Sequence, residues 1–327
     1  MKKVSIGILG YNEEYGIAHL LDSLQLQTLL QQDYALEIIV ISNGSQDQMA
    51  AMARAKLAEF DQLKNPIKSQ VIELPIADKC AAWNHFIHQA ADVADYYICL
   101  DADVVLVQPT GLEELLQTLI THPECRICGG KVLNKRGEIT NHHFIDGKCY
   151  AIRGEIARNI YIPNGVIADD VYVAATALTN WYKTTPEVGE AKGYTRLTEK
   201  PVVRSGDTPR DRDKSYWIAC RKRTIMAEYA QRRLDYCMRS IFGGGDLAKT
   251  MVLKLATTHP NWFLAYLHQV SRSDFAPQFN PPHLKPPISI YQVAQFLVYC
   301  YCYLLSVLGI RNQEFGHLAW KLKHRYW

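Results

Sequence analysis

The sequence predicts an α/β fold in which a mostly parallel central sheet is flanked by helices. Short apolar segments rich in β-branched residues alternate with helical segments over the first hundred residues. Strands that are joined in this way form parallel sheets with right-handed crossovers. The composition, 48% hydrophobic and 21% charged over 327 residues, is that of a globular protein with one large domain or two smaller ones.

Four strands and three helices are predicted in the first part of the chain. The strands are short apolar runs bounded by polar residues or glycine, at 4–9, 36–41, 70–74 and 96–100. Helical periodicity or alanine-rich composition predicts the segments between them, at 17–29, 48–60 and 79–94. Ligands of such sheets bind at the carboxyl ends of the strands, so a site is expected there.

The pattern changes after residue 103. Helices are predicted at 112–121 and 167–178, and two strands at 126–133 and 138–144, on either side of a turn. The stretch 201–214 is polar and rich in Arg, Asp, Pro and Gly, which predicts a mobile loop. A basic amphipathic helix is expected at 215–239.

Charge and cysteine content limit the function classes. A net charge of +3 is too small to indicate a nucleic-acid partner. The nine cysteines lie in apolar runs and lack the spacing of a zinc site. Buried reduced thiols are therefore expected, and with them a cytosolic compartment. The first apolar run, 4–9, is too short for a signal peptide.

The segment 287–310 contains no charged residue. About 20 such residues can span a bilayer, but Gln292, Gln295 and several tyrosines lower the hydrophobicity of this segment. A single span would also place the basic C-terminal tail on the opposite side from the rest of the chain. We therefore expect a helix that lies in the membrane plane, with the tail on anionic headgroups. A buried core helix or a dimer-interface helix is the alternative.

Asp101-Ala102-Asp103 follows the strand at 96–100 directly. Carboxylate oxygens suit hard divalent cations such as Mg²⁺ and Mn²⁺, which keep open positions for water and phosphate oxygens. The pair therefore indicates a cation that holds a diphosphate and neutralises it. A polar strand end without a metal is the alternative.

Other polar groups are expected at the same edge of the sheet. Gly10-Tyr11-Asn12 and Asn43-Gly44-Ser45 also follow predicted strands. Lys79 begins a predicted helix, where a cation opposes the helix dipole, so an anionic partner is expected for it. The adjacent carboxylates Asp169 and Asp170 repel each other, which raises the pKa of one and suits a base that works near neutral pH.

Taken in order, these motifs resemble those of the GT-A glycosyltransferases of family 2. The residues that carry the resemblance are Gly10-Tyr11-Asn12-Glu13-Glu14, Ser42-Asn43-Gly44-Ser45-Gln46-Asp47, Lys79 with Asn84, Asp101-Ala102-Asp103 and Asp169-Asp170. The resemblance implies a GT-A fold with a Rossmann-like sheet. It also implies a catalytic domain at 1–225, divided into a nucleotide-binding half (1–103) and an acceptor half (104–225). A C-terminal helical, membrane-associating region then covers 226–327.

The same resemblance assigns roles to residues. It implies a metal site for Mn²⁺ or Mg²⁺ at Asp101 and Asp103, and a catalytic base at Asp170 with Asp169 beside it. It places Asp146 and Trp217 on the acceptor side. The donor would be bound by Tyr11, Asn12, Glu13, Asn43, Lys79, Asp101, Arg221 and Arg223. Family members that make polymers carry Gln-x-x-Arg-Trp where this chain has Trp217 to Arg223, so processive synthesis is not expected.

The expected function is therefore that of an inverting, metal-dependent glycosyltransferase. It would move sugar from a nucleotide-sugar, with UDP as the favoured nucleotide, to a hydroxyl of a glycan, glycolipid or lipid-linked acceptor. The expected location is the cytoplasm, peripherally on the inner face of the membrane. A non-catalytic nucleotide-sugar-binding or membrane scaffold protein and a sugar nucleotidyltransferase are the alternatives.

Overall fold

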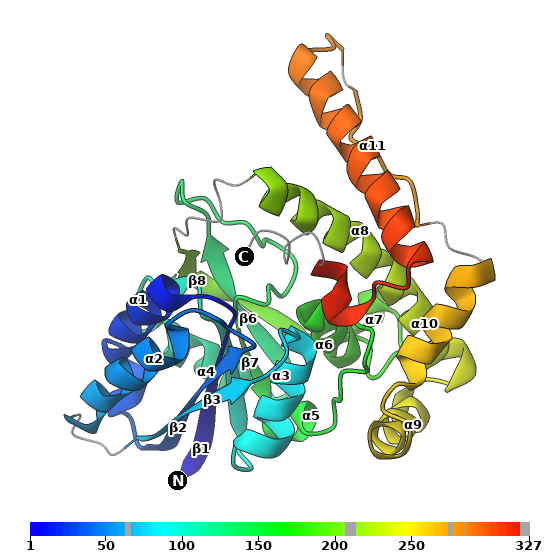
Figure 1. Cartoon of the computed structure of the whole chain (residues 1–327). Coiled ribbons are helices and arrows are strands. Elements are labelled where there is room, and N and C mark those ends of the chain that lie inside the picture. Colours follow the sequence, from blue (N-terminus) through cyan, green and yellow to red (C-terminus); the bar gives the residue numbers. More distant parts are fainter. Residues whose placement is uncertain (63–66, 207–213, 274–276, 285, 321–327) are drawn as a thin grey trace.

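The computed structural model describes residues 1–62, 67–206, 214–273, 277–284 and 286–320. Within these ranges the centre is an eight-stranded mixed sheet in the order β3-β2-β1-β4-β7-β6-β8-β5 (Figure 1). The strands are β1 (Lys2–Gly10), β2 (Tyr34–Asn43), β3 (Lys68–Leu74), β4 (Tyr96–Asp101), β5 (Val104–Leu106), β6 (Ile127–Leu133), β7 (Cys149–Arg153) and β8 (Thr195–Ser205). The predicted α/β class is confirmed.

The four strands predicted in the first part of the chain are present and parallel. β1 pairs with β2 and β4, and β2 pairs with β3. Successive side chains point to opposite faces, so Leu100 packs on one face of the sheet and Cys99 on the other. The first face is covered by α1 (Glu14–Gln25), α2 (Met49–Leu57) and α4 (Gly111–Thr121). The second is covered by α3 (Lys79–His85), α6 (Asp169–Leu178) and α8 (Lys214–Tyr236).

Several predicted helices are shorter than expected. The helix predicted at 79–94 ends as α3 at His85 and continues only as a π-helical turn, Phe86–Ala90. The helices predicted at 17–29 and 48–60 end in short 3-10 helices at Thr28–Gln31 and Ala58–Gln62. Two short helices absent from the prediction are α5 (Gly154–Ala157) and α7 (Pro186–Ala191).

The prediction of a strand at 138–144 is wrong. Leu133 and Ile139 form only an isolated bridge. Beyond this bridge, the buried side-chain amide of Asn141 bonds to β6 where the backbone of a neighbouring strand would otherwise do so. Its Oδ1 accepts from the Val132 N–H at 2.8 Å, and its Nδ2 donates to the Gly130 carbonyl at 3.0 Å. The chain enters the sheet later, as β7, antiparallel to both β4 and β6.

The prediction of a loop at 201–214 is wrong for its first part. Residues 201–205 belong to β8, which pairs with β6 in parallel and with β5 in antiparallel orientation. The pairing shifts register where Lys131 faces Pro201, and such an irregular position tolerates the missing N–H of proline. Residues 207–213 of the predicted loop lie outside the described residues.

The C-terminal part is helical. After α8 and a π-helical turn (Cys237–Ile241) come α9 (Gly245–Thr258), α10 (Trp262–Ser273), α11 (Ile290–Arg311) and a 3-10 helix (Gly316–Trp320). The basic helix predicted at 215–239 corresponds to α8, and the apolar segment 287–310 to α11. Helix α8 runs across the predicted domain division at residue 225, and that division stays a prediction.

Helix α11 extends away from the rest of the molecule, with its carboxyl end against α8 (Figure 1). Tyr299 and Cys302 pack on Ile225 of α8, and the Ser306 hydroxyl donates to the Lys222 carbonyl at 3.2 Å. The other face is an exposed apolar stripe at three- and four-residue spacing, each side chain between 41% and 91% exposed, formed by Ile290, Val293, Leu297, Tyr301, Leu304 and Leu308. Among the described helices, α11 alone has the length and apolar composition to cross a membrane.

Residues 312–320, the C-terminal turn, lead back from α11 to the sheet. Glu314 forms a buried ion pair with Lys222 of α8, with Nζ and Oε2 2.5 Å apart. His317 Nδ1 lies 3.7 Å from Oδ2 of Asp78, the N-cap of α3. The basic tail from residue 321 onward lies outside the described residues. The C-terminal turn therefore connects α11 with the start of the helix that carries Lys79.

All nine cysteines are free, and most of them are buried, as predicted. Burial raises the pKa of the Cys99 thiol and that of the Cys128 thiol to about 12. These two thiols are therefore protonated and unreactive at neutral pH. They serve as small apolar groups in the core.

Candidate active site

The loops that follow β1 and β2 are tied together at the carboxyl edge of the sheet. Asn12, at φ +52°, accepts a hydrogen bond from the Gln46 N–H at 2.8 Å and donates its own N–H to Ser45 Oγ at 3.0 Å. Asp47 accepts from the N–H of Met49, the first residue of α2, and from that of Glu14, the first of α1, so it supports both helix starts. Glu13 is buried beside Asn12. Hydrogen bonds between the two loops therefore fix their positions at this edge of the sheet.

Asn43 connects this loop pair to α3. Its side-chain Oδ1 accepts from the Asp78 N–H at 3.0 Å, and Asp78 in turn caps α3 through the Ala81 N–H. Asn84, further along the same helix, is paired in both directions with the backbone of Ile162. The Asn43 oxygen thus positions the start of α3, which was predicted to bind the donor. Asn84 holds the chain that leads to Asp169.

The centre of the site is an ion cluster on the second face of the sheet. Lys79 Nζ lies 2.6 Å from Asp101 Oδ1 and 3.7 Å from Asp169 Oδ1. The Asp169 side chain is only 3% exposed, whereas those of Asp101 and Lys79 are 23% and 30% exposed. The anionic partners that the sequence predicts for Lys79 are therefore carboxylates of the site itself.

Burial dominates the ionisation of this cluster. It raises the pKa of the Asp101 carboxyl to about 7; Lys79 opposes the rise, and Asp103 and Asp169 add to it. Burial also raises the pKa of Asp169, again opposed by Lys79 and reinforced by Asp170. Burial alone would lower the pKa of Lys79, but Asp101, Asp169 and Asp170 hold it well above its ordinary value. The lysine is thus charged at neutral pH, whereas Asp101 is about half protonated there.

Asp103 is the group in this cluster that fits a cation. Its Oδ1 is buried and has no hydrogen-bond partner among the described residues. A buried carboxylate oxygen without a hydrogen bond lowers the stability of the fold unless a ligand binds to it. Within the described ranges no three His, Cys, Asp or Glu side chains are grouped so as to hold a metal by themselves. A cation at Asp101 and Asp103 would therefore take further ligands from water or phosphate, as Mg²⁺ commonly does.

The loop that precedes β7 passes close to Asp170 and holds its side chain in position. Its Oδ2 accepts the Gly147 N–H at 3.1 Å. A Cβ added at Gly147 would lie 2.9 Å from Asp170 Cβ and 3.0 Å from Asp170 Cγ, so glycine is required for this contact. Asp170 stands in the first turn of α6, where carboxylates are favoured by the helix dipole.

The three residues of α8 that were predicted to bind donor or acceptor lie in different surroundings. Arg223 donates to the Ile167 carbonyl at 2.9 Å, two residues before Asp169, and its charge lowers the pKa of Asp169 against the effect of burial. Arg221 is exposed and lies 6.0 Å from the ring of Tyr299 on α11. Trp217 is 53% exposed at the start of α8. The structure therefore brings Arg223 to the cluster and directs Arg221 toward α11.

Sequence analysis missed a second lysine in the site. Lys148 Nζ lies 3.4 Å from Oδ1 of Asp146, the predicted acceptor-side residue, whose Oδ1 also accepts the Lys148 N–H. Burial would lower the pKa of Lys148, but Asp146, Asp101 and Asp103 raise it overall. Its place follows from the pairing of β7 with β4, for which the sequence gives no local signal.

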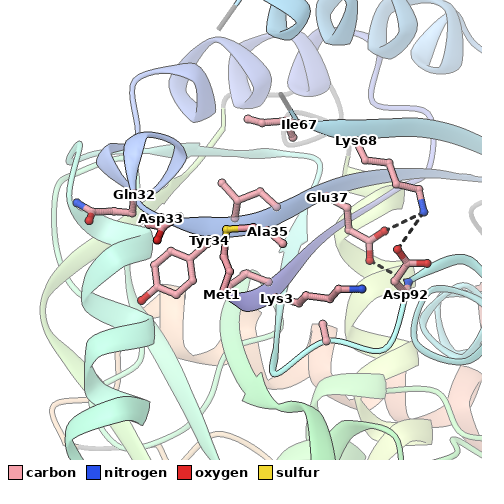
Figure 2. Close-up of a pocket in the computed structure, with 13 residues that line it drawn as sticks. Met1, Lys3, Gln32, Asp33, Tyr34, Ala35, Glu37, Ile67, Lys68 and Asp92 are labelled. Carbon is pink, nitrogen blue, oxygen red and sulfur yellow. Dashed lines mark hydrogen bonds and ion pairs between the residues drawn. The ribbon is translucent and has the colours of Figure 1, made fainter. Parts of the chain in front are cut away.

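A cavity of about 620 Å³ opens at the opposite, amino edge of the sheet, and Figure 2 shows it. It is lined by residues from the starts of β1, β2 and β3 and by Asp92. There Lys68 Nζ lies 3.2 Å from Asp92 Oδ2 and 3.6 Å from Glu37 Oε2. This cavity is separate from the ion cluster at the carboxyl edge.

Comparison with solved structures agrees with the fold. A mannosyltransferase of Pyrobaculum calidifontis, in complex with GDP-Man and Mn²⁺, matches with a TM-score of 0.56 and 16% identity, over 93% of this chain and 86% of the other. Glucosyl-3-phosphoglycerate synthase of Mycobacterium tuberculosis, in complex with phosphoglyceric acid, gives 0.47 and 16%, over 69% and 80%. No curated protein matches the chain in sequence.

The sheet order and the likeness to the mannosyltransferase define a fold of the GT-A type. The family described as glycosyl transferase family 2 matches residues 5–168, about half of the sequence. The chain belongs to glycosyl transferase family 2 and is a glycosyltransferase. The resemblance inferred from the motifs is confirmed.

Proposed function

We propose that the protein transfers sugar from a nucleotide-sugar to a hydroxyl acceptor with inversion, in a reaction that needs a divalent cation. The observation that carries the proposal is the buried Asp103 oxygen, which has no hydrogen-bond partner among the described residues and lies beside the cluster of Lys79, Asp101 and Asp169. The complex of the Pyrobaculum mannosyltransferase with GDP-Man and Mn²⁺ supports a nucleotide-sugar and a metal. UDP remains our favoured nucleotide, with GDP as the competing one.

Different residues of this chain bind the metal, the phosphates and the nucleoside of the donor in this proposal. Asp101 and Asp103 would hold Mn²⁺ or Mg²⁺, which, when bound, neutralises the charge of the departing diphosphate. Lys79 supplies a second positive charge beside the same phosphates, and buried Asp169 keeps it in place. Tyr11, Asn12, Glu13 and Asn43 line the nucleoside end of the donor site.

Asp170 is the proposed base. It takes the proton of the acceptor hydroxyl as that oxygen attacks the anomeric carbon from the side opposite to the leaving diphosphate. One displacement with one base inverts the anomeric centre. The Gly147 N–H fixes Asp170 Oδ2 and leaves its other oxygen to face the acceptor.

We further propose that the acceptor is a membrane glycolipid or lipid-linked glycan, reached from the cytoplasmic face. The stripe on α11 supports this, because it is a continuous row of exposed apolar side chains, as in helices that lie in the headgroup region. In this proposal residues 1–225 form the catalytic domain, with Asp146 and Trp217 on its acceptor side, and 226–327 the membrane-associating region.

The enzyme proposal is tested with purified protein and a panel of UDP-, GDP- and dTDP-sugars, with Mn²⁺ or Mg²⁺. We expect nucleoside diphosphate to be released from one donor and the release to stop with EDTA. Metal-dependent binding of a donor without any turnover, unchanged in Asp170→Asn, would instead support a non-catalytic nucleotide-sugar-binding protein.

The membrane proposal is tested by flotation with vesicles of phosphatidylcholine and phosphatidylglycerol. We expect the protein to float, and the double substitution Leu297→Gln and Leu304→Gln to abolish flotation. Leu247→Gln, at an equally exposed leucine of α9, is the matched control. If the double variant floats as well as the wild type, the stripe is not the membrane contact. If it instead converts a dimer to a monomer, the stripe joins two copies.

A further inference from the structure

Lys148 is placed at the reaction centre by the sheet itself. β7 pairs with β4 so that Cys149 faces Leu100. The next pair in this register is Lys148 and Asp101, and the Asp101 N–H donates to the Lys148 carbonyl at 3.1 Å. Side chains of directly opposed residues lie on the same face of a sheet. The Lys148 side chain therefore leaves the sheet on the face that carries Asp101.

The backbone on the other side of Lys148 is fixed to the proposed base. Gly147 donates its N–H to Asp170 Oδ2, and the Lys148 N–H is held by Asp146 Oδ1. Lys148 thus stands between Asp170, where the acceptor hydroxyl is activated, and the Asp101–Asp103 pair, where the diphosphate departs.

The ammonium group of Lys148 has a weak resting partner. Its distances to the two Asp146 oxygens are 3.4 and 3.5 Å, long for a charge-assisted hydrogen bond. Its side chain is 31% exposed, and Asp101 and Asp103 contribute to the rise in its pKa. A flexible, charged lysine with a long contact of this kind can leave its partner for a stronger anion at little cost.

We propose that Lys148 is a phosphate-binding residue, whose ammonium group leaves Asp146 to pair with a phosphate oxygen at the reaction centre. This inference rests on the proposed function. Two phosphates can lie there: the leaving diphosphate, which gains negative charge as the anomeric C–O bond breaks and its electron pair stays on the phosphate oxygen, and a phosphate of a lipid-linked acceptor. Both offer the same chemistry to a lysine.

The first arm of the test measures binding of UDP and GDP with Mn²⁺ by calorimetry, for the wild type, Lys148→Gln and Lys148→Arg. If the partner is the diphosphate, we expect K148Q to weaken binding of the preferred nucleotide about tenfold to hundredfold, and K148R to restore most of the affinity. Lys131→Gln is the matched control, since the ammonium group of Lys131, on neighbouring β6, donates to the Glu199 carbonyl.

The second arm measures inorganic phosphate binding to enzyme already saturated with the nucleotide and Mn²⁺. A loss in K148Q confined to this arm identifies the acceptor phosphate as the partner. If both arms are unchanged in a folded K148Q, Lys148 binds no phosphate and the inference is wrong. Failure of the wild type to bind either nucleotide would contradict the proposed function instead, so the two failures are distinguishable.

Discussion

The two edges of the sheet carry similar groups in different surroundings. At the amino edge, Lys68 lies 3.2 Å from Asp92 and 3.6 Å from Glu37 (Figure 2). At the carboxyl edge, Lys79 lies 2.6 Å from Asp101 and 3.7 Å from Asp169. Lys68 and Asp92 are 57% and 54% exposed, so water screens this pair, although Glu37 beside them is only 8% exposed. Asp169 is 3% exposed, so the carboxyl-edge cluster is screened far less.

The charge balance also differs between the two edges. Around the carboxyl edge stand the carboxylates of Asp101, Asp103, Asp146, Asp169 and Asp170, against the cations of Lys79, Lys148 and Arg223. The five acids outnumber the three basic groups, and this excess of acidic groups favours the binding of a divalent cation. A lysine between two acids therefore does not by itself indicate a ligand-binding site. The carboxyl-edge cluster differs from the other in its burial and in its excess of acidic groups.

The largest effect is expected from Asp170→Asn. Asparagine keeps the size and can still accept the Gly147 N–H, but it cannot take a proton. We expect kcat to fall about a hundredfold to ten-thousandfold, the range for loss of a general base, with donor affinity little changed. Nucleotide release with the preferred donor measures it. Retention of more than a tenth of the wild-type rate would remove Asp170 from the mechanism.

A matched pair of substitutions tests the comparison of the edges directly. Lys79→Met should weaken nucleotide binding about tenfold to hundredfold, because a charge-assisted contact to phosphate is lost. Lys68→Met removes a lysine of similar geometry from the amino edge and should change binding less than about twofold. Calorimetry on both variants gives the result. Equal effects of the two substitutions would contradict the distinction between the edges.

Gly147→Ala should act through geometry alone. The new Cβ would lie 2.9 Å from Asp170 Cβ, so the carboxylate must move. A displacement of about 1 Å can cost up to about a hundredfold in rate, and we expect a loss of about tenfold or more in kcat. Nucleotide affinity should be retained, since Gly147 is not a donor-site residue. Loss of affinity with an unchanged kcat would show that the loop serves the donor instead.

Metal affinity should depend on pH. The pKa of Asp101 is raised to about 7, so below that pH a cation must displace a proton. Affinity for Mn²⁺ should therefore rise about tenfold from pH 6 to pH 8 and level off above it. Titration calorimetry in two buffers of different protonation enthalpy reports the released proton at pH 6. An affinity that is flat across this range would show that Asp101 is already ionised.

Much of this arrangement was predictable from sequence because its signals are local. Strands β1, β2, β3 and β4 are continuous apolar runs, and Asp101 and Asp103 follow the last of them. The topological rule for parallel sheets then brings the strand ends together. The pairing of Lys79 with Asp101 and Asp169 is consistent with this rule and supplies the anionic partner expected for Lys79.

Strand β6 was predicted at 126–133, but the rest of the second half of the sheet was not predictable because its determinants are distant in sequence. Asn141 replaces a backbone partner of β6, which ends the expected strand at 138–144. Pro201 joins β8 at a register shift despite a loop-like composition. Lys148 acquires its place only through the pairing of β7 with β4, so no motif indicates it. Local patterns give the first half, and long-range register decides the second.

The most direct measurement is Mn²⁺ binding together with the preferred nucleoside diphosphate, for the wild type and Asp103→Ala. The central claim is that the buried Asp103 oxygen binds a divalent cation, which also binds the diphosphate. It predicts that Mn²⁺ strengthens nucleotide binding to the wild type and has no such effect on D103A, and that turnover is lost in that variant and with EDTA. Equal enhancement by Mn²⁺ in both proteins, or full turnover in EDTA, would contradict the claim.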